Sequence, residues 1–266
     1  MNDRRTTPGT ARSLALGDTT IDYLPDGAVQ LVPRGWFPGA AEAVWSENAE
    51  WLDPAGCLTA GIGALLIRRD NRAMLIDTGF GPRHLPAATT IAPLGDLTGG
   101  ALPDSLRALG VSPADIDTIA LTHLHEDHTG WASLFPHAQF VAAAAEWGPA
   151  RPARAVGAAE GDEIFPGVRL LELPGHTPGH AGYVVTTTEG TLLAFGDALH
   201  SPLQITHPEW GAASDVQPEQ AARSRERVLA ELRAPGTIGF GNHFADLVFG
   251  RITDPPGKPP RWTPVT

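Results

Sequence analysis

Side chains that can bind metals are concentrated in residues 122–128, which read Thr-His-Leu-His-Glu-Asp-His. Five of these seven side chains can bind a metal ion or move a proton. Histidine and aspartate suit zinc, iron or manganese better than metals that prefer thiolate ligands. The stretch follows an apolar, β-rich run at residues 116–121. We therefore predict a buried strand that ends in a metal-binding loop, where the strand fixes the backbone and the loop aims the side chains.

Three later positions repeat this arrangement of a chemically active side chain after an apolar run. They are His176, Asp197 and His243, which follow residues 168–173, 191–195 and 237–240. Strand ends that converge on one edge of a sheet system would bring all these side chains into one two-metal site. Two cations in such a site need a shared anion, which a carboxylate and a hydroxide can supply. A lone histidine is more often a surface or core residue, but this ordered set argues against chance.

The order His-x-His-x-Asp-His, then His, Asp and His, resembles the signature of the metallo-β-lactamase superfamily, with all seven positions filled. The resemblance implies an α/β fold, the four-layer αββα sandwich of two mixed β-sheets flanked by helices. It also implies two divalent metal ions, with zinc favoured and iron or manganese as alternatives. One ion would be held by His123, His125 and His176, the other by Asp127, His128 and His243, and Asp197 would bridge them.

Two residues are candidates for catalysis beside the metal ions. A dinuclear site can supply a metal-bridging hydroxide at neutral pH, because it lowers the pKa of a bound water to about 7. Asp127 is predicted to receive or relay a proton, since one of its carboxylate oxygens can remain free of metal. His200 is predicted to face the pocket and donate a hydrogen bond to substrate. Acyl-homoserine-lactone lactonases typically carry a tyrosine there, so His200 looks closer to the methyl-parathion-hydrolase-like branch.

Supporting roles are expected for two further residues. The resemblance implies that Asp77, in Ile-Asp-Thr-Gly at 76–79, supports the metal loop rather than binding metal. His180 is expected to be structural, because the ligand positions are already filled. The remaining histidines, His84, His137 and His207, are interpreted as incidental.

Among the activities of the family, the sequence favours a metal-dependent hydrolase of a carboxylic ester or lactone, with aryl organophosphates as a side activity. Asp197 argues against a true β-lactamase, which usually lacks the bridging aspartate. A glyoxalase-type thioesterase remains an alternative, although Arg251, Lys258 and Arg261 are few basic residues for glutathione. A mononuclear-iron sulfur dioxygenase of the same fold is another, and a non-catalytic binding protein is a third. The natural substrate stays open.

Composition sets limits on partners and compartment. The chain has 266 residues, a formal net charge of -11 and one cysteine, Cys57. The negative charge argues against nucleic acid and anionic membrane surfaces as partners. A single cysteine allows no internal disulfide, and no run is apolar enough for a membrane span, so we expect a cytoplasmic protein. The expected partner is a small-molecule substrate. A homodimer stays open.

The remaining segments are expected to form one domain over residues 13–252. Residues 1–12 are expected to be a flexible N-terminus, and the proline-rich residues 253–266 a surface tail. Residues 219–232 are predicted to form a helix whose charged face is solvated. Residues 34–51 carry three tryptophans, which are interpreted either as core packing or as part of a lid or subunit contact. The irregular residues 80–100 are expected near the mouth of the site.

Overall fold

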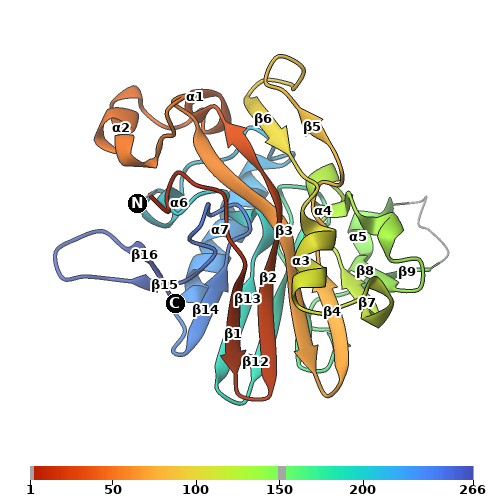
Figure 1. Ribbon diagram of the computed structural model, residues 1–266. Helices are drawn as coiled ribbons and strands as arrows, with labels where there is room; N and C mark the ends of the chain where they lie inside the picture. The colour runs from red at the N-terminus through yellow and green to blue at the C-terminus, as the bar shows by residue number, and fades with distance from the viewer. Residues whose placement is uncertain (1–2, 149–153, 266) are drawn as a thin grey trace.

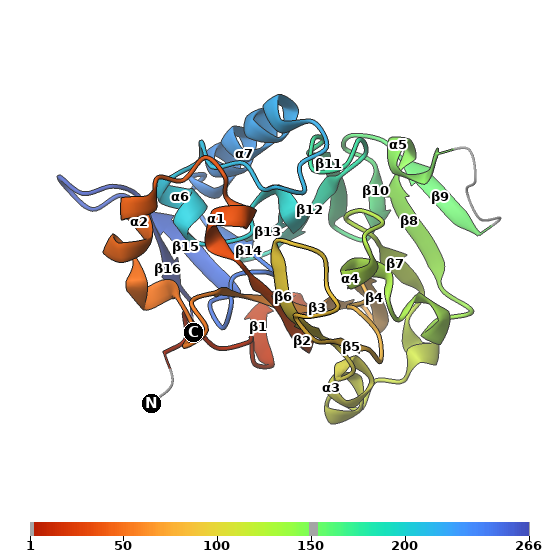
Figure 2. The same ribbon diagram turned by 90° about the horizontal axis from the view of Figure 1, so that it is seen from above.

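The computed structural model describes residues 3–148 and 154–265, which form two β-sheets packed face to face with helices on both outer sides (Figure 1). Seen from above, α7 covers one sheet and α3 lies on the far side of the other (Figure 2). This is the αββα sandwich expected from the sequence. In the described part of the chain, no helix is both long and apolar enough to cross a membrane.

The first sheet has the strand order β5-β6-β2-β3-β4-β7-β8-β9, with β1 paired to β2. Its strands are β1 (Arg12–Leu16), β2 (Thr19–Leu31), β3 (Leu58–Arg69), β4 (Arg72–Ile76), β5 (His84–Leu85), β6 (Leu94–Thr98), β7 (Thr118–Ala120), β8 (Gln139–Ala143) and β9 (Ala155–Ala158). The strands from β1 to β4 pair antiparallel, while β4, β7, β8 and β9 run parallel. Parallel strands end at the same edge, which is where the metal loop begins.

The second sheet has the strand order β10-β11-β12-β13-β14-β15-β16. Its strands are β10 (Glu163–Phe165), β11 (Val168–Glu172), β12 (Ala181–Thr187), β13 (Gly190–Ala194), β14 (Thr237–Phe240), β15 (Phe249–Thr253) and β16 (Arg261–Pro264). The helices are α1 (Pro33–Trp36), α2 (Glu42–Glu47), α3 (Leu102–Ala108), α4 (Glu126–Thr129), α5 (Ala144–Trp147), α6 (Leu203–Thr206) and α7 (Pro218–Leu232). Since β13 and β14 are parallel neighbours, the loops that follow them open on one edge.

Local sequence explains the hairpins and the longest helix. The β3–β4 turn places Asp70 and Asn71 at φ 50° and 61°, a left-handed conformation that these short polar residues tolerate. Helix α7 begins at Pro218, whose missing N–H is not needed in the first turn. Its apolar residues Val228 and Leu229 are buried against the second sheet, within the cluster that contains Leu193, Phe195 and Trp262.

The structure differs from three expectations about the surface at particular residues. Residues 261–264 form β16 on the edge of the second sheet, and Trp262 is buried rather than part of a surface tail. At the other end, Arg4 and Thr10 donate hydrogen bonds to Asp246, so the expected flexible N-terminus is tied down over these described residues. On α7, Arg223, Glu226 and Arg227 are exposed as predicted for the charged face, but the side chain of Arg225 is buried.

The tryptophan-rich segment, residues 34–51, contributes to an apolar cluster. Trp36 and Trp45 are buried, which agrees with core packing, whereas Trp51 is only partly buried. The ring of Trp45 packs 5.5 Å from that of Trp210, centroid to centroid. This packing fixes α1 and α2 beside the loop that follows α6.

Candidate metal centre

The predicted ligands come from four strand ends that meet at one edge of the two sheets. The loop after β7 carries residues 123–128, and the loops after β11, β13 and β14 carry His176, Asp197 and His243. The first sheet therefore supplies four of the side chains and the second sheet supplies three. The site lies across the junction between the sheets.

The predicted ligands form two groups on either side of the Asp197 carboxylate, and a third group of Asp197, His200 and His243 overlaps them. Ligand atoms of His123, His125, His176 and Asp197 all lie within 4.8 Å of one another, as do those of Asp127, His128 and His243. Oδ2 of Asp197 lies 3.4 Å from Nε2 of His176, whereas Oδ1 lies 3.1 Å from Nε2 of both His128 and His243. Each carboxylate oxygen thus faces a different group, as a bridging ligand requires.

Unpartnered atoms at the centre fit a pair of cations. Nε2 of His123, Nε2 of His128 and Oδ1 of Asp197 are buried and have no hydrogen-bond partner among the residues that the structure describes. Buried polar atoms normally find partners, so this concentration of unpartnered atoms calls for a bound group. Nitrogen and carboxylate oxygen donors in these numbers suit divalent zinc, iron or manganese.

The opposite nitrogen of four histidine rings is held by the protein. Metal-binding histidines commonly have such a partner, because it fixes the ring orientation and the tautomer. The contacts of Nδ1 are His123 to Thr122 Oγ1 at 3.0 Å, His128 to Asp77 Oδ2 at 2.8 Å, His176 to Asp215 Oδ1 at 3.2 Å, and His243 to the Gly61 carbonyl at 2.7 Å. These rings consequently direct Nε2 toward Asp197.

Asp77 supports the metal loop, as expected for this position. Its carboxylate accepts hydrogen bonds from the Thr122 backbone N–H at 2.8 Å and from the Thr122 hydroxyl, besides its contact with His128. The residue has a φ of 62°, a strained conformation for a side chain other than glycine. The hydrogen bonds stabilise this conformation and place the carboxylate under the loop.

Burial and neighbouring charges set the protonation of the site without metal. Burial opposes the charged form of Asp197, but His243, His128 and His123 outweigh it and hold the pKa of Asp197 well below its usual range. Burial, assisted by the charge of His128, brings the pKa of His123 well below its usual value. For His128, burial lowers the pKa, but Asp197 and Asp77 raise it further and the net shift is upward. A metal ion at His128 therefore has to displace a proton.

His180 and His200 differ from the ligand histidines. Nδ1 of His180 donates to the Leu173 carbonyl and its Nε2 accepts from the Asp197 backbone N–H, a structural role in line with expectation. His200 lines the cavity, and over residues 3–148 and 154–265 neither of its ring nitrogens has a hydrogen-bond partner. Its Nε2 lies 3.2 Å from Oδ2 of Asp197. Unlike the four rings above, the ring of His200 has no hydrogen bond on its far side within the described part of the chain.

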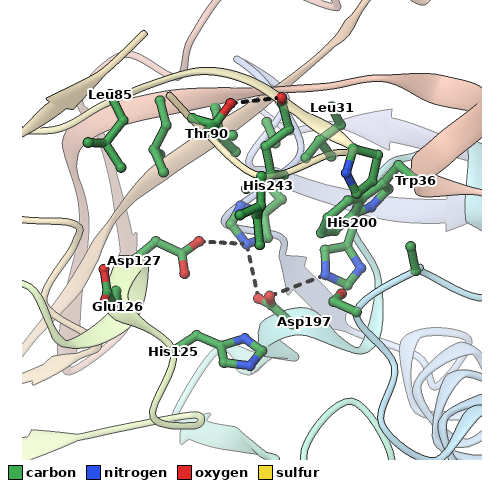
Figure 3. Close-up of a pocket in the computed structure, with 18 of the residues that line it drawn as sticks. Leu31, Trp36, Leu85, Thr90, His125, Glu126, Asp127, Asp197, His200 and His243 are labelled. Carbon is green, nitrogen blue, oxygen red and sulfur yellow. Dashed lines mark hydrogen bonds and ion pairs between the residues drawn. The ribbon is translucent and has the colours of Figure 1, made fainter. Parts of the chain in front are cut away.

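A cavity of about 540 Å³ opens over the metal groups (Figure 3). Asp127 and His200 lie on opposite sides of Asp197 in this view. The wall above them is mainly apolar and includes Val29, Leu31, Trp36, Phe80, Leu85, Ile91, Leu94 and Leu97. Segment 80–100 thus lies at the cavity, as predicted. Among the described residues that line it, none is a lysine or an arginine, and the carboxylate of Glu126 pairs with Arg83 at 2.8 Å.

Asp26 anchors both ends of segment 80–100. Its Oδ2 accepts from the Phe80 N–H at 2.7 Å, and its Oδ1 accepts from the Gly100 and Leu102 N–H groups at 3.0 and 2.9 Å. The indole of Trp131 donates to the same carboxylate at 2.8 Å. This buried carboxylate closes the irregular segment into a defined wall.

Sequence reasoning missed several side chains that support the site. Glu146 accepts from the Leu124 N–H and from the Thr177 hydroxyl, and so joins the two loops that carry the first metal group. Asp215 contacts His176, and Arg225 donates to Asp215 at 2.9 Å. None of these residues belongs to a recognisable motif, because their contacts depend on how distant segments pack. The incidental His84 and His137 are exposed, and His207 stacks on Trp210.

Comparisons with known proteins agree with this geometry. Residues 63–238 match the Metallo-beta-lactamase superfamily. An N-acyl homoserine lactonase of Bacillus sp is 28% identical over 204 residues, which cover 68% of this chain and 81% of that protein. The fold is also that of AbOPH, a hydrolase in the beta lactamase superfamily, with a TM-score of 0.83 at 24% identity over 98% of this chain and 99% of the other.

A second solved structure is AidC, a dizinc quorum-quenching lactonase in complex with a product. It aligns with a TM-score of 0.79 at 21% identity and covers 99% of both chains. With the matched residues, the shared fold and the two ligand groups, the chain belongs to the metallo-beta-lactamase superfamily and is a metal-dependent hydrolase that resembles the lactonase-like members of that family.

Proposed function

We propose that this protein is a dinuclear-metal hydrolase that cleaves neutral, apolar carboxylic esters or lactones. The observation that carries the proposal is the bridging geometry of Asp197, whose two oxygens face separate ligand groups beneath an apolar cavity. His123, His125 and His176 would hold one ion, and Asp127, His128 and His243 the other. The ions would supply an activated water and a Lewis acid that polarises the substrate carbonyl.

Asp127 is suited to handle the proton released from water. Its Oδ2 lies 3.8 Å from Nε2 of His243, and its side chain is partly exposed toward the cavity. A carboxylate that uses one oxygen as a ligand keeps the other for a proton. Asp127 can thus accept the proton and pass it to the leaving oxygen.

His200 is suited to orient the substrate. Burial lowers the pKa of His200 to about 4 despite the nearby charge of Asp197, so the ring is neutral at pH 7 and has one N–H to donate. The edge of the ring packs against Trp36, with centroids 5.2 Å apart. A substrate oxygen near the bridging position would accept a hydrogen bond from His200, while its apolar part lies along the wall.

The cavity favours esters and lactones over the two alternatives. A glutathione thioester is anionic, yet Arg251, Lys258 and Arg261 lie on β15, on β16 or between them and do not line the cavity. A single-iron dioxygenase would leave the group of Asp127, His128 and His243 without a role. The lactonase activity in the names of the relatives supports the same choice, with zinc favoured as the metal.

The test combines metal content with a substrate panel on the same preparation. Elemental analysis is expected to give two zinc ions per chain. Turnover of p-nitrophenyl esters and γ-lactones is expected to be lost on chelation, and kcat/KM is expected to rise with the length of the alkyl group. A glutathione thioester and an aryl phosphotriester serve as comparison substrates. One iron per chain, no ester turnover and oxygen uptake with a persulfide would overturn the proposal.

A further inference from the structure

We propose that Asp215 and Arg225 are positioning residues that hold His176 in the first metal group and connect it to the cavity wall. The proposal rests on the metal binding proposed above for His176. Neither residue is among the described residues that line the cavity, and neither belongs to the second metal group. Their role is to act through the ring of His176.

The contacts form a buried chain from α7 to the metal group. Arg225, on α7, donates from Nη1 to Oδ2 of Asp215 at 2.9 Å, and its Nε donates to the Pro208 carbonyl at 3.0 Å. Oδ1 of Asp215 lies 3.2 Å from Nδ1 of His176. The side chains of Asp215, Arg225 and His176 are each no more than 3% exposed. Water therefore cannot replace these partners.

The chain of contacts selects one state of the His176 ring. Arg225 is always protonated, so it keeps a cation beside Asp215 and favours the carboxylate form. A carboxylate can only accept, so Nδ1 of His176 must carry the proton and Nε2 must present its lone pair. Nε2 lies 3.4 Å from Oδ2 of Asp197, on the side of the first metal group. Asp215 therefore prepares His176 to bind a metal.

The same segment also forms part of the cavity wall. The Ala213 N–H donates to the Trp36 carbonyl at 2.8 Å, and the Val216 N–H donates to the His176 carbonyl at 3.2 Å. Ala213 and Ser214 line the cavity directly before Asp215. A shift of Asp215 would consequently move both a metal ligand and the surface that contacts substrate. We expect metal affinity and KM to change together when this residue is altered.

The second metal group has its own carboxylate contact, which makes the inference specific. Asp77 holds Nδ1 of His128, whereas Asp215 holds Nδ1 of His176. Two independent carboxylates thus orient one histidine in each group. Removing the Asp215 carboxylate should weaken the binding of one ion and leave the binding of the other unchanged.

The experiment measures stepwise zinc binding to metal-free protein by competition with a chromophoric chelator, and cobalt spectra report each site. Asp215→Asn and Arg225→Gln are expected to lower the affinity for one of the two ions by about 10- to 100-fold and to raise KM. The affinity for the other ion should stay unchanged. Arg225→Lys keeps the charge and is expected to recover most of the affinity. Arg227→Gln is the matched control, because Arg227 lies on the same helix but is exposed and pairs with Glu160.

Folding is checked separately by circular dichroism of each metal-free variant. A ¹⁵N histidine spectrum of folded variants gives a readout that a merely structural role would not change, since the Nδ1–H of His176 should lose its carboxylate partner. Wild-type binding of both ions by the Asp215→Asn and Arg225→Gln variants would overturn the positioning role alone. Failure of the wild-type chain to bind two ions would overturn the proposed function and this inference together.

Discussion

Nδ1 of His128 lies 2.8 Å from Oδ2 of Asp77, on the side of the ring that faces away from Asp197. The contact joins the end of β4 to the metal loop after β7, because Asp77 also accepts from Thr122. The parallel pairing of β4 and β7 brings these segments together. The sheet itself therefore determines where the second metal group forms.

Asp77→Asn is expected to lower the affinity for the ion at His128 about 10- to 100-fold, because an amide no longer selects the tautomer with a proton on Nδ1. Loss of these buried contacts should also lower the free energy of unfolding by about 1–3 kcal/mol. Zinc titration and urea denaturation measure the two effects. Asp70→Asn, in the β3–β4 turn, is the control. Full affinity for both ions in the Asp77 variant would contradict the supporting role.

His200→Gln is expected to lower kcat/KM by about 10²- to 10³-fold, the usual loss when one donor to a reacting oxygen is removed. Two metal ions should remain, because His200 is not needed to hold either. Steady-state kinetics and metal analysis of one preparation separate the two roles. His84→Gln, at an exposed position, is the control. Loss of a metal ion in the His200 variant would instead make it a ligand.

Metal removal is expected to lower the thermal stability of the protein, because the ligands come from both sheets and the ions would hold the sheets together. An ion present at about 1,000 times its Kd stabilises the folded state by about 4 kcal/mol. Differential scanning calorimetry with and without chelator should show a fall in Tm. The Asp197→Ala variant should show a smaller fall. An unchanged Tm of the wild-type chain would argue that no ion is bound there.

Asp246 is expected to make stability depend on pH. Burial raises its pKa, but hydrogen bonds from Thr10 and the nearby Arg12 outweigh burial and hold the pKa below its usual range. Because the folded-state value is depressed, this stabilisation is present above an ordinary pKa of about 4 and is lost as pH falls through the folded value.

Asp246→Asn should therefore lower the free energy of unfolding at pH 7 by about 1–3 kcal/mol and make it less sensitive to pH in acid. Urea denaturation between pH 3 and 7 measures both effects. Asp254→Asn is the control, because its side chain is exposed. Equal losses in the two variants would show that Asp246 has no special role.

The sequence predicted that the side chains of the candidate ligands would lie close together, because their spacing is local and each group follows an apolar run. His123, His125 and Asp127 are close in the chain, and strand ends in parallel order bring the other ligands to the same edge. The helix at residues 219–232 was also predicted from its apolar periodicity, and it begins one residue earlier.

Contacts between distant segments could not be predicted in the same way. Arg225 has the charged neighbours of a solvated helix face, and only its packing beside Asp215 shows that it is buried. Trp262 lies in a proline-rich stretch that favours an extended tail, yet its indole N–H donates to the Leu247 carbonyl and its ring packs in the core. These positions are set by tertiary contacts that leave no periodic signal.

The absence of lysine and arginine among the described cavity-lining residues has a consequence for product release. Hydrolysis of an ester or lactone turns a neutral molecule into a carboxylate. Apart from the metal ions proposed here, the described residues that line the cavity offer this new anion no lysine or arginine, and the carboxylate of Glu126 is paired with Arg83 outside that lining. The product should consequently be a weak inhibitor, and the enzyme should continue to turn over while its acid product accumulates.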